Sequence, residues 1–517
     1  MQVLFVLLQA CLLAAAAIGC GWHLMHILQL ESYQLPGYKR SLFRNPLENI
    51  VKPLIVGIIG LVTVLCGLPR LLCLLLTCGA AAVLFFMTRR EKSKKPFKVT
   101  DRVKRLLLIH AGISLLLEII CLVFLPPLAY LLPGLEPLVL VLAALAAQPV
   151  ERRIADEFIE DAKRRLDRMP DMIKIGITGS YGKTSTKFLL REILSIRYRV
   201  LATPSSFNTP MGVTRVIREQ LMPTHQVFIA EMGARHVGDI RELCDLVHPQ
   251  IGLITSVGPQ HLDTFGTIDR VKDTKYELIE ALPEGGTAVF AKDGAICDEL
   301  YERCPLVDKY QADSVFHAES IQCGPWGTRF QLVNNATGEQ VACETRLLGE
   351  YAISNLLLCS TAASVLGLTM EEIARGIHMC HPIEHRLQLL DGGGGISIID
   401  DAFNSNPSGA KAALHVLRDF PARRIIVTPG MVELGEREAE LNREFGREMA
   451  SCADIVFLVG PKHCEPIAEG LREAGFSEAN MFISKNLEES TRKLNSMMRA
   501  GDVILYENDL PDNYNEN

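Results

Sequence analysis

The sequence holds 15 cysteines but has no C-x-x-C pair. Six of them fall in strongly apolar stretches near the amino terminus, where a thiol behaves as a small hydrophobic side chain. The other nine are scattered, which argues against a disulfide framework and against a zinc site, and is typical of reduced thiols in a cytosolic domain. A histidine-rich segment at 378–385 fits no common ligand spacing, so we expect no metal there.

Lys and Arg are absent before Lys39, and charges of either sign are rare in the first 150 residues. This region contains five apolar stretches, each close to the ~20 residues that span a bilayer as a helix. They lie at about 2–20, 50–68, 70–87, 106–125 and 129–148. The first lacks the basic start and the cleavage site of a signal peptide. We therefore predict an α-helical transmembrane region of about five helices at 1–150, followed by a helical connector at 151–169.

The charge divides at the same boundary. Residues 1–150 carry 14 Lys+Arg against 6 Asp+Glu, a net charge of +8, whereas the whole chain is at −7, which leaves −15 for residues 151–517. An acidic globular part argues against sequence-independent binding of nucleic acid. The basic residues gather at 39–44, 89–105 and 152–165, which the positive-inside rule places in the cytoplasm.

These loops predict a multi-pass protein of the cell membrane, in contact with lipid, with its amino terminus outside and its catalytic part in the cytoplasm. The fifth stretch is interrupted by Pro133, Gly134, Glu136 and Pro137, so a re-entrant segment is an alternative there.

A glycine is missing from the strict phosphate-loop pattern G-x-x-x-x-G-K-[ST], because Ile177 stands at its first position. The context is otherwise complete, with an apolar strand at 173–178, a glycine turn, Gly-Lys-Thr and a helical run at 187–196. Backbone N–H groups of such a loop and the helix amino terminus attract phosphate. The loop predicts a nucleotide site formed by Gly179, Ser180, Gly182, Lys183, Thr184 and Ser185.

Two further apolar strands end in polar residues. The strand at 227–230 runs into Glu231, and the strand at 251–257 runs toward His261. Alternating strands and helices predict an α/β fold with a mostly parallel sheet, in which ligands lie at the carboxyl ends of the strands. We expect Glu231 and His261 to share one cleft with Thr184.

The soluble part resembles the Mur ligase family over about residues 172–505, closest to the branch that adds D-alanyl-D-alanine to the muramyl tripeptide. The motifs that carry the resemblance follow in the family's order: Gly176-Ile-Thr-Gly-Ser-Tyr-Gly-Lys-Thr184, Ser206-Phe-Asn-Thr-Pro-Met-Gly212, Ala230-Glu-Met-Gly233, Ser256-Val-Gly-Pro-Gln-His261, Asp273-Thr-Lys275, Gly349-Glu-Tyr-Ala-Ile-Ser-Asn355, Glu384-His-Arg386, Asp400-Asp-Ala-Phe-Asn404-Ser-Asn406-Pro407 and Gly430-Met-Val-Glu-Leu-Gly435.

The resemblance implies a central P-loop, parallel-sheet ATPase domain at 170–383 and a Rossmann-like carboxy-terminal domain at 384–517. It also implies ATP and two Mg²⁺ ions as cofactors, with Lys183, His261 and Lys275 in the catalytic centre. Thr184 and Glu231 would hold one magnesium ion and His261 and Lys275 the other.

In the family the lysine at the position of Lys275 is carboxylated by CO₂. The carboxylation replaces an ammonium, which the magnesium ions would repel, with an anionic ligand. Without the resemblance, a lysine on the predicted helix at 271–282 favours a surface salt bridge. The resemblance further assigns Asn355 to the adenine, Arg386 and Asp401 to the phosphates and ribose, and Asn208, Asn404 and Asn406 to the substrate.

The implied reaction is amide formation through an acyl phosphate. A substrate carboxylate attacks the γ-phosphate, and an amine, either an amino acid or a dipeptide, then displaces phosphate. Two departures leave the carboxylate substrate open between UDP-linked and lipid-linked precursors of the cell wall. Membrane stretches stand where the family has its uridine-binding domain, and the end of the chain reads Tyr506-Glu507-Asn508-Asp509 instead of a Lys-Gly-Ser type motif.

Two alternatives to a peptidoglycan ligase stay open from the sequence. One is a ligase that builds poly-amino acids, of the cyanophycin type. The other is a membrane scaffold that keeps a nucleotide fold without catalysis.

Overall fold

The computed structural model describes residues 2–89, 96–205, 207–260, 262–324, 326–403, 405–432 and 434–509. Its chain divides into two compact units, residues 1–157 and 158–517.

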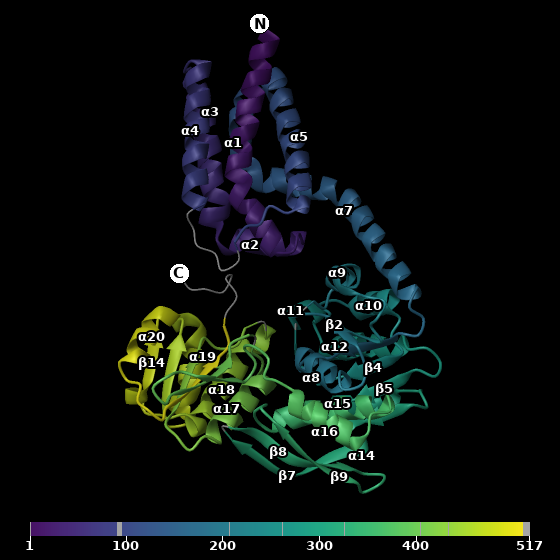
Figure 1. Cartoon of the computed structure of the whole chain (residues 1–517). Helices are drawn as coiled ribbons and strands as arrows, with labels where there is room; N and C mark the ends of the chain where they lie inside the picture. Colours follow the sequence, from purple (N-terminus) through teal and green to yellow (C-terminus); the bar gives the residue numbers. More distant parts are fainter. Residues whose placement is uncertain are drawn as a thin grey trace. The chain divides into compact units, whose positions relative to one another are not determined.

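The first unit is helical, and its helices α1, α3, α4 and α5 run side by side (Figure 1). The elements are α1 (Gln2–Leu30), α2 (Leu35–Arg44), the π-helical η1 (Leu47–Val51), α3 (Lys52–Leu65), α4 (Arg70–Arg89), α5 (Asp101–Phe124), α6 (Pro126–Leu131), the 3-10 helix η2 (Leu132–Leu135) and α7 (Glu136–Asp167). Five helical segments are long and apolar enough to cross a membrane, which agrees with the number of stretches expected from the sequence.

The basic segment at 89–105 was expected to lie wholly between two membrane stretches, and this expectation is wrong for its last residues. Residues 102–105 belong to α5, which begins at Asp101 because the Thr100 side chain accepts a hydrogen bond from the N–H of Val103 and caps the helix. Arg89 ends α4, and residues 90–95 lie outside the described part of the chain. At the interrupted fifth stretch, a 3-10 turn at Leu132–Leu135 joins two helices.

The second unit begins in the last turns of α7 and continues into a six-stranded, wholly parallel sheet with the order β2-β3-β1-β4-β5-β6. Its strands are β1 (Ile173–Thr178), β2 (Val200–Ala202), β3 (Val227–Glu231), β4 (Ile251–Ile254), β5 (Thr287–Phe290) and β6 (Lys309–Gln311). The strands predicted at 173–178 and 227–230 are therefore present.

Helices cover both faces of this sheet, which is why its strands are almost continuously apolar. One face packs against α8 (Lys183–Leu194), α15 (Glu350–Val365) and α16 (Met370–Met379). The other packs against α9 (Pro210–Gln220), α10 (Asp239–Val247), α12 (Ile268–Glu280) and α13 (Gly294–Arg303). Two short helices lie in connecting segments: α11 (Leu262–Phe265) between β4 and α12, and α14 (Ala312–Val315) between β6 and β7.

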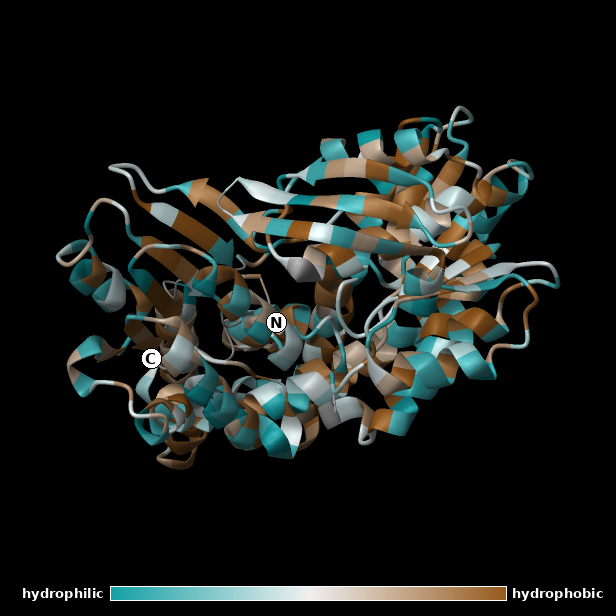
Figure 2. Cartoon of the chain, turned by 90° about the horizontal axis from the view of Figure 1, so that it is seen from below, coloured by the Kyte–Doolittle hydropathy of each residue, from teal (hydrophilic) through white to brown (hydrophobic). Residues whose placement is uncertain are grey.

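An antiparallel sheet adds β7 (Phe316–Gly324), β8 (Gly327–Asn334) and β9 (Gln340–Thr345). A second six-stranded sheet follows, with the order β10-β11-β15-β12-β13-β14. It is parallel except for the edge strand β10. In Figure 2 its strands are largely brown, whereas the helices carry both colours, as burial of the sheet between helices requires.

The elements of this carboxy-terminal region are β10 (Gln388–Asp391), β11 (Ser397–Asp401), α17 (Pro407–Arg418), β12 (Arg424–Thr428), η3 (Gly435–Arg437), α18 (Glu438–Cys452), β13 (Ile455–Val459), α19 (Pro461–Glu473), η4 (Glu478–Asn480), β14 (Met481–Ser484), α20 (Leu487–Asn495) and β15 (Val503–Glu507).

Candidate active site

The phosphate loop connects β1 to α8 and is tied to the segment after β4. Gly179 and Gly182 both have positive φ, +151° and +79°, which side chains adopt at a cost. The Ser180 hydroxyl donates to the carbonyl of Gly258 at 2.9 Å, and Tyr181 Oη donates to the carbonyl of Pro259 at 2.9 Å. These bonds hold the loop at the carboxyl end of the sheet, with the amino terminus of α8 beside it.

Lys183 closes the loop on itself. Its ammonium donates to the carbonyls of Gly179 and Ser180 at 2.7 and 2.8 Å. Burial lowers the pKa of Lys183 to about 8, against the opposing effect of Glu231. Thr184 and Ser185 follow in the first turn of the helix, where backbone N–H groups have no partner within the helix.

Glu231 ends β3 and is the centre of a buried polar cluster. Its Oε1 accepts from the Thr184 hydroxyl and from Asn208 Nδ2, both at 3.1 Å, and its Oε2 accepts from Lys187 Nζ at 2.8 Å. Burial by itself raises the pKa of this carboxyl, but Lys187 and Lys183 lower it below its usual range. The site therefore holds a carboxylate, as a cation site requires.

Lys275 lies in α12 and is 2 % exposed. It forms no salt bridge with any carboxylate of the described residues, so the surface salt bridge expected from a lone helical lysine is wrong. Burial, and then the charge of Lys183, lower the pKa of Lys275 to about 7. An uncharged amine is the form that can react with CO₂.

The other predicted contacts are placed as follows. Asn355 in α15 accepts from the Thr186 hydroxyl of α8 at 3.2 Å, which brings it to the helix that follows the phosphate loop. Asn406 caps α17 by accepting from the N–H of Gly409 at 2.9 Å. His261 and Asn404 lie outside the described residues, and their roles stay predictions.

The carboxy-terminal sheet places further polar residues at the carboxyl ends of its strands. Asp401 ends β11 and pairs in register with Glu507 at the end of β15. Asp401 accepts from the N–H of Leu387 at 3.1 Å, and burial raises its pKa to about 6. The Arg386 guanidinium stands 4.6 Å from the ring centre of Phe403, and its charge acts on Lys183.

The sequence reading missed Lys187 and Glu507. Lys187 is fully buried and binds Glu231 and the carbonyl of Ser205. Glu507 accepts from the hydroxyls of Ser405 and Thr428, and burial raises its pKa to about 8. Lys187 lies one helical turn after Lys183, on the same face of α8, and that spacing was a readable signal.

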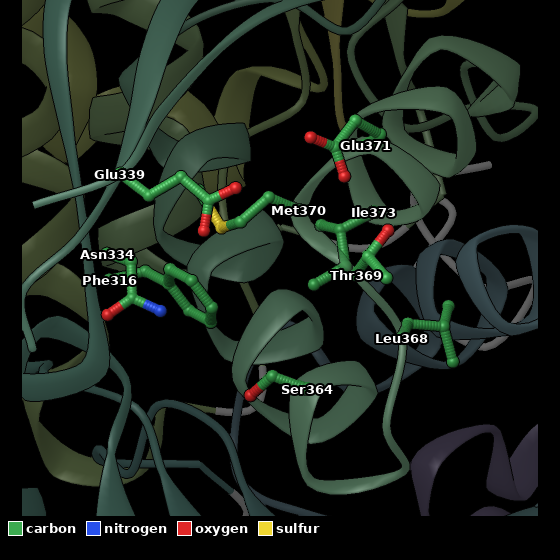
Figure 3. A pocket seen from close by; sticks show the side chains of 9 residues that line it. All are labelled: Phe316, Asn334, Glu339, Ser364, Leu368, Thr369, Met370, Glu371 and Ile373. Carbon is green, nitrogen blue, oxygen red and sulfur yellow. The ribbon is translucent and has the colours of Figure 1, made fainter. Parts of the chain in front are cut away.

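A separate pocket of about 400 Å³ lies between the antiparallel sheet and α16. Figure 3 shows Phe316 and Asn334 on one side of it and Leu368 and Thr369 on the other. None of the predicted site residues lines it, so it does not belong to the candidate active site.

The residues at the phosphate loop fit a magnesium nucleotide. Magnesium takes hard oxygen ligands, and the Thr184 hydroxyl and the Glu231 carboxylate offer two, 3.1 Å apart. A glycine loop, a lysine and a helix amino terminus stand beside them. This arrangement on a parallel sheet defines a nucleotide-dependent enzyme of the P-loop class.

Comparison with known proteins agrees with this class and narrows it. Residues 177–363 match the Mur ligase middle domain, and residues 385–506 match the Mur ligase glutamate ligase domain. The UDP-N-acetylmuramoyl-tripeptide--D-alanyl-D-alanine ligase of Mycobacterium tuberculosis is 29 % identical over 357 residues, which cover 64 % of this chain and 69 % of that protein. The chain belongs to the Mur ligase family.

Solved structures share the fold. MurF from Acinetobacter baumannii superposes with a TM-score of 0.63 at 23 % identity, over 70 % of this chain and 78 % of that one. The MurF ligase of Thermotoga maritima in complex with ADP gives a TM-score of 0.60 at 24 % identity, over 69 % and 80 %. The predicted fold class and the prediction of an ATP-dependent ligase of the Mur type are confirmed.

Proposed function

We propose that this protein is a membrane-anchored ligase that forms an amide bond in the synthesis of peptidoglycan precursors, with an acyl phosphate as intermediate. The observation that carries the proposal is the cluster of Thr184, Glu231, Lys187 and Asn208 beside the phosphate loop. The five long apolar helices support the anchor, and the basic residues at 39–44 and at 152–165, in the last part of α7, favour a cytoplasmic catalytic part.

Each site residue has a role in this proposal. Lys183 and the N–H groups of the loop bind the nucleotide phosphates, and Thr184 and Glu231 hold one magnesium ion. His261 and a carbamate on Lys275 hold a second. Magnesium neutralises the charge on the phosphoryl group that is transferred.

The surroundings of Lys275 support the carbamate. A buried ammonium without a carboxylate partner is costly, and Lys183 nearby adds repulsion. Attack of the neutral amine on CO₂ forms a C–N bond, and loss of one proton leaves an anion. The negative charge of the carbamate is compatible with a position between cations.

The reaction then proceeds in two transfers. A carboxylate oxygen of the first substrate attacks the γ-phosphorus, the bond to the β-phosphate oxygen breaks, and ADP leaves. The neutral amine of the second substrate attacks the acyl carbon, the C–O bond to phosphate breaks, and the nitrogen loses a proton. Arg386 and Asp401 bind the nucleotide from the carboxy-terminal domain, and closure of that domain excludes water from the acyl phosphate.

The names of the relatives suggest the substrates. The curated relatives join D-alanyl-D-alanine to a UDP-N-acetylmuramoyl-tripeptide. We propose a muramyl tripeptide as the carboxylate substrate and a dipeptide as the amine. The apolar helices favour a lipid-linked form of the tripeptide as the substrate. The UDP-linked form is the alternative.

Oxygen transfer tests the acyl phosphate. With ¹⁸O in the substrate carboxylate, we expect one ¹⁸O atom in the phosphate released per amide formed, measured by mass spectrometry. Release of unlabelled phosphate together with the amide would contradict the mechanism. Running the UDP-linked and lipid-linked tripeptides in parallel identifies the substrate by rate.

A further inference from the structure

The helical unit encloses a group of ionisable side chains that the ligase reaction does not use. His110, Ser114 and Glu118 follow one another at four-residue spacing, so they share one face of α5. Glu136, the first residue of α7, binds His110 with 2.7 Å between Oε2 and Nε2. His110, Glu118 and Glu136 are all 0 % exposed. The burial comes from the helices themselves and does not depend on a surrounding bilayer.

The group is built by several helices. Gly21 of α1 faces it, since a Cβ at this position would lie 2.7 Å from a carboxylate oxygen of Glu136 and 3.4 Å from Cε1 of His110. The charge of Glu136 acts on Glu118 and on Tyr38 of α2. The titratable groups on which Glu118 or Glu136 acts from the surrounding helices are Cys20, Tyr38, Cys78, His110 and Cys121. No Lys or Arg is among them.

Several polar atoms of this group lack a hydrogen-bond partner within the described part of the chain. They are both carboxylate oxygens of Glu118, Oε1 of Glu136, Nδ1 of His110, Oγ of Ser114 and the hydroxyl of Tyr38. Buried polar atoms are nearly always satisfied, so unmet atoms concentrated at one place point to something bound there. One of these atoms, the hydroxyl of Tyr38, lies on α2 and not on α5 or α7, and Tyr38 is only 1 % exposed. The unmet atoms are therefore not confined to the carboxyl groups.

The charges indicate what is bound. The cluster holds two carboxyl groups and one imidazole, and the imidazole of His110 pairs with Glu136, so an ionised Glu118 would be left without a compensating charge. A buried carboxylate without a compensating charge strongly destabilises the folded state. Among residues 2–89 and 96–157, no three His, Cys, Asp or Glu side chains are arranged to hold a metal ion. A proton is therefore the positive charge that the site fits best.

We propose that this cluster is a proton-binding site, in which Glu118 carries one exchangeable proton at neutral pH beside the Glu136–His110 pair. Glu118 is the carrier because it alone has no partner for either oxygen. Ionisable groups enclosed by membrane-spanning helices commonly mark proton pathways.

Infrared spectroscopy on the full-length protein in lipid nanodiscs tests the proposal. Because burial raises the pKa of Glu507 to about 8, that carboxyl also contributes a protonated band at pH 7. The measured quantity is therefore the difference spectrum of wild type minus Glu118→Gln, in which we expect the C=O stretch of a protonated carboxylic acid that shifts on transfer from H₂O to D₂O. The matched control is Glu48→Gln, because Glu48 pairs with Lys52 at a partly exposed position and should leave the band unchanged.

A second measurement separates charge from structure. Glutamine has the shape of a protonated glutamate, so Glu118→Gln should keep the wild-type melting temperature at pH 7. A difference spectrum at pH 7 that lacks this C=O band would overturn the proposal. So would carboxylate bands at pH 7 that change when Na⁺ is exchanged for K⁺, since a monovalent cation would then occupy the site. A large loss of melting temperature in Glu118→Gln would show that the charged form is needed and would equally overturn it.

Discussion

At the scale of single residues, substitution of Lys275 distinguishes a carbamate that binds magnesium from a lysine that acts as a cation. An arginine in its place stays cationic at any accessible pH and cannot be carboxylated. We expect Lys275→Arg and Lys275→Ala each to lower the amide-forming rate by about 10²-fold or more, the scale of losing one electrostatic group of a transition state. Added short-chain carboxylic acids should partly restore Lys275→Ala, because they can place an anion in the vacated space. Near-normal activity of Lys275→Arg would rule out the carbamate.

Lys187 compensates the charge of Glu231 where both side chains are buried. Its removal in Lys187→Met leaves a buried carboxylate unpaired, at a cost of about 3–5 kcal/mol. Because Mg²⁺·ADP supplies another cation beside Glu231, we expect it to raise the melting temperature of Lys187→Met more than that of the wild type. Lys272→Met is the matched control, since Lys272 pairs with Glu299 at the surface. An equal or smaller rise in Lys187→Met would contradict this role.

At the scale of elements, the helix that carries the phosphate-binding residues is fixed by close packing. Gly376 of α16 faces α8, and a Cβ there would stand 2.6 Å from Cα of Ile193. We expect Gly376→Ala to destabilise the protein by about 1–3 kcal/mol, despite the better helix propensity of alanine, and to weaken nucleotide binding by displacing α8. Urea denaturation and ADP titration measure both effects. In Gly112→Ala no neighbour lies within 4 Å of the new Cβ, so this control should not lose stability.

The elements also show how far the sequence could be read. Strand β1, the glycine turn and the start of α8 follow from apolar runs and turn chemistry, which are local. The start of α5 was misplaced because the cap at Thr100 is a single side-chain hydrogen bond inside a basic run. The burial of Lys275 could not be read from its helix, because it depends on packing between α12 and residues distant in sequence. The position of Lys187 one turn after Lys183 could be read from the sequence, but its pairing with Glu231 could not, because Glu231 lies on strand β3.

At the scale of the whole molecule, the membrane topology is open to a direct test. If the five apolar helices span a membrane with the amino terminus outside, reporters fused after Phe97 and after Met169 should be cytoplasmic, and one at Pro69 should be external. The fusion at Pro69 is decisive, because it falls between α3 and α4, outside the basic stretches at 39–44 and 89–105. A cytoplasmic reporter at Pro69 would contradict the five-span topology.

The proposed activity joins a carboxylate to an amine at the expense of ATP. The most direct measurement is ADP and amide formation by the purified full-length protein, given ATP, Mg²⁺, a muramyl tripeptide and D-alanyl-D-alanine. We predict one ADP per amide, dependence on both substrates and on Mg²⁺, and loss of turnover in Lys183→Ala. This variant should still fold, because among the described residues the Lys183 ammonium donates its hydrogen bonds to the carbonyls of Gly179 and Ser180. Amide formation that is unaffected by Lys183→Ala, or ATP turnover that is independent of both substrates, would contradict the account.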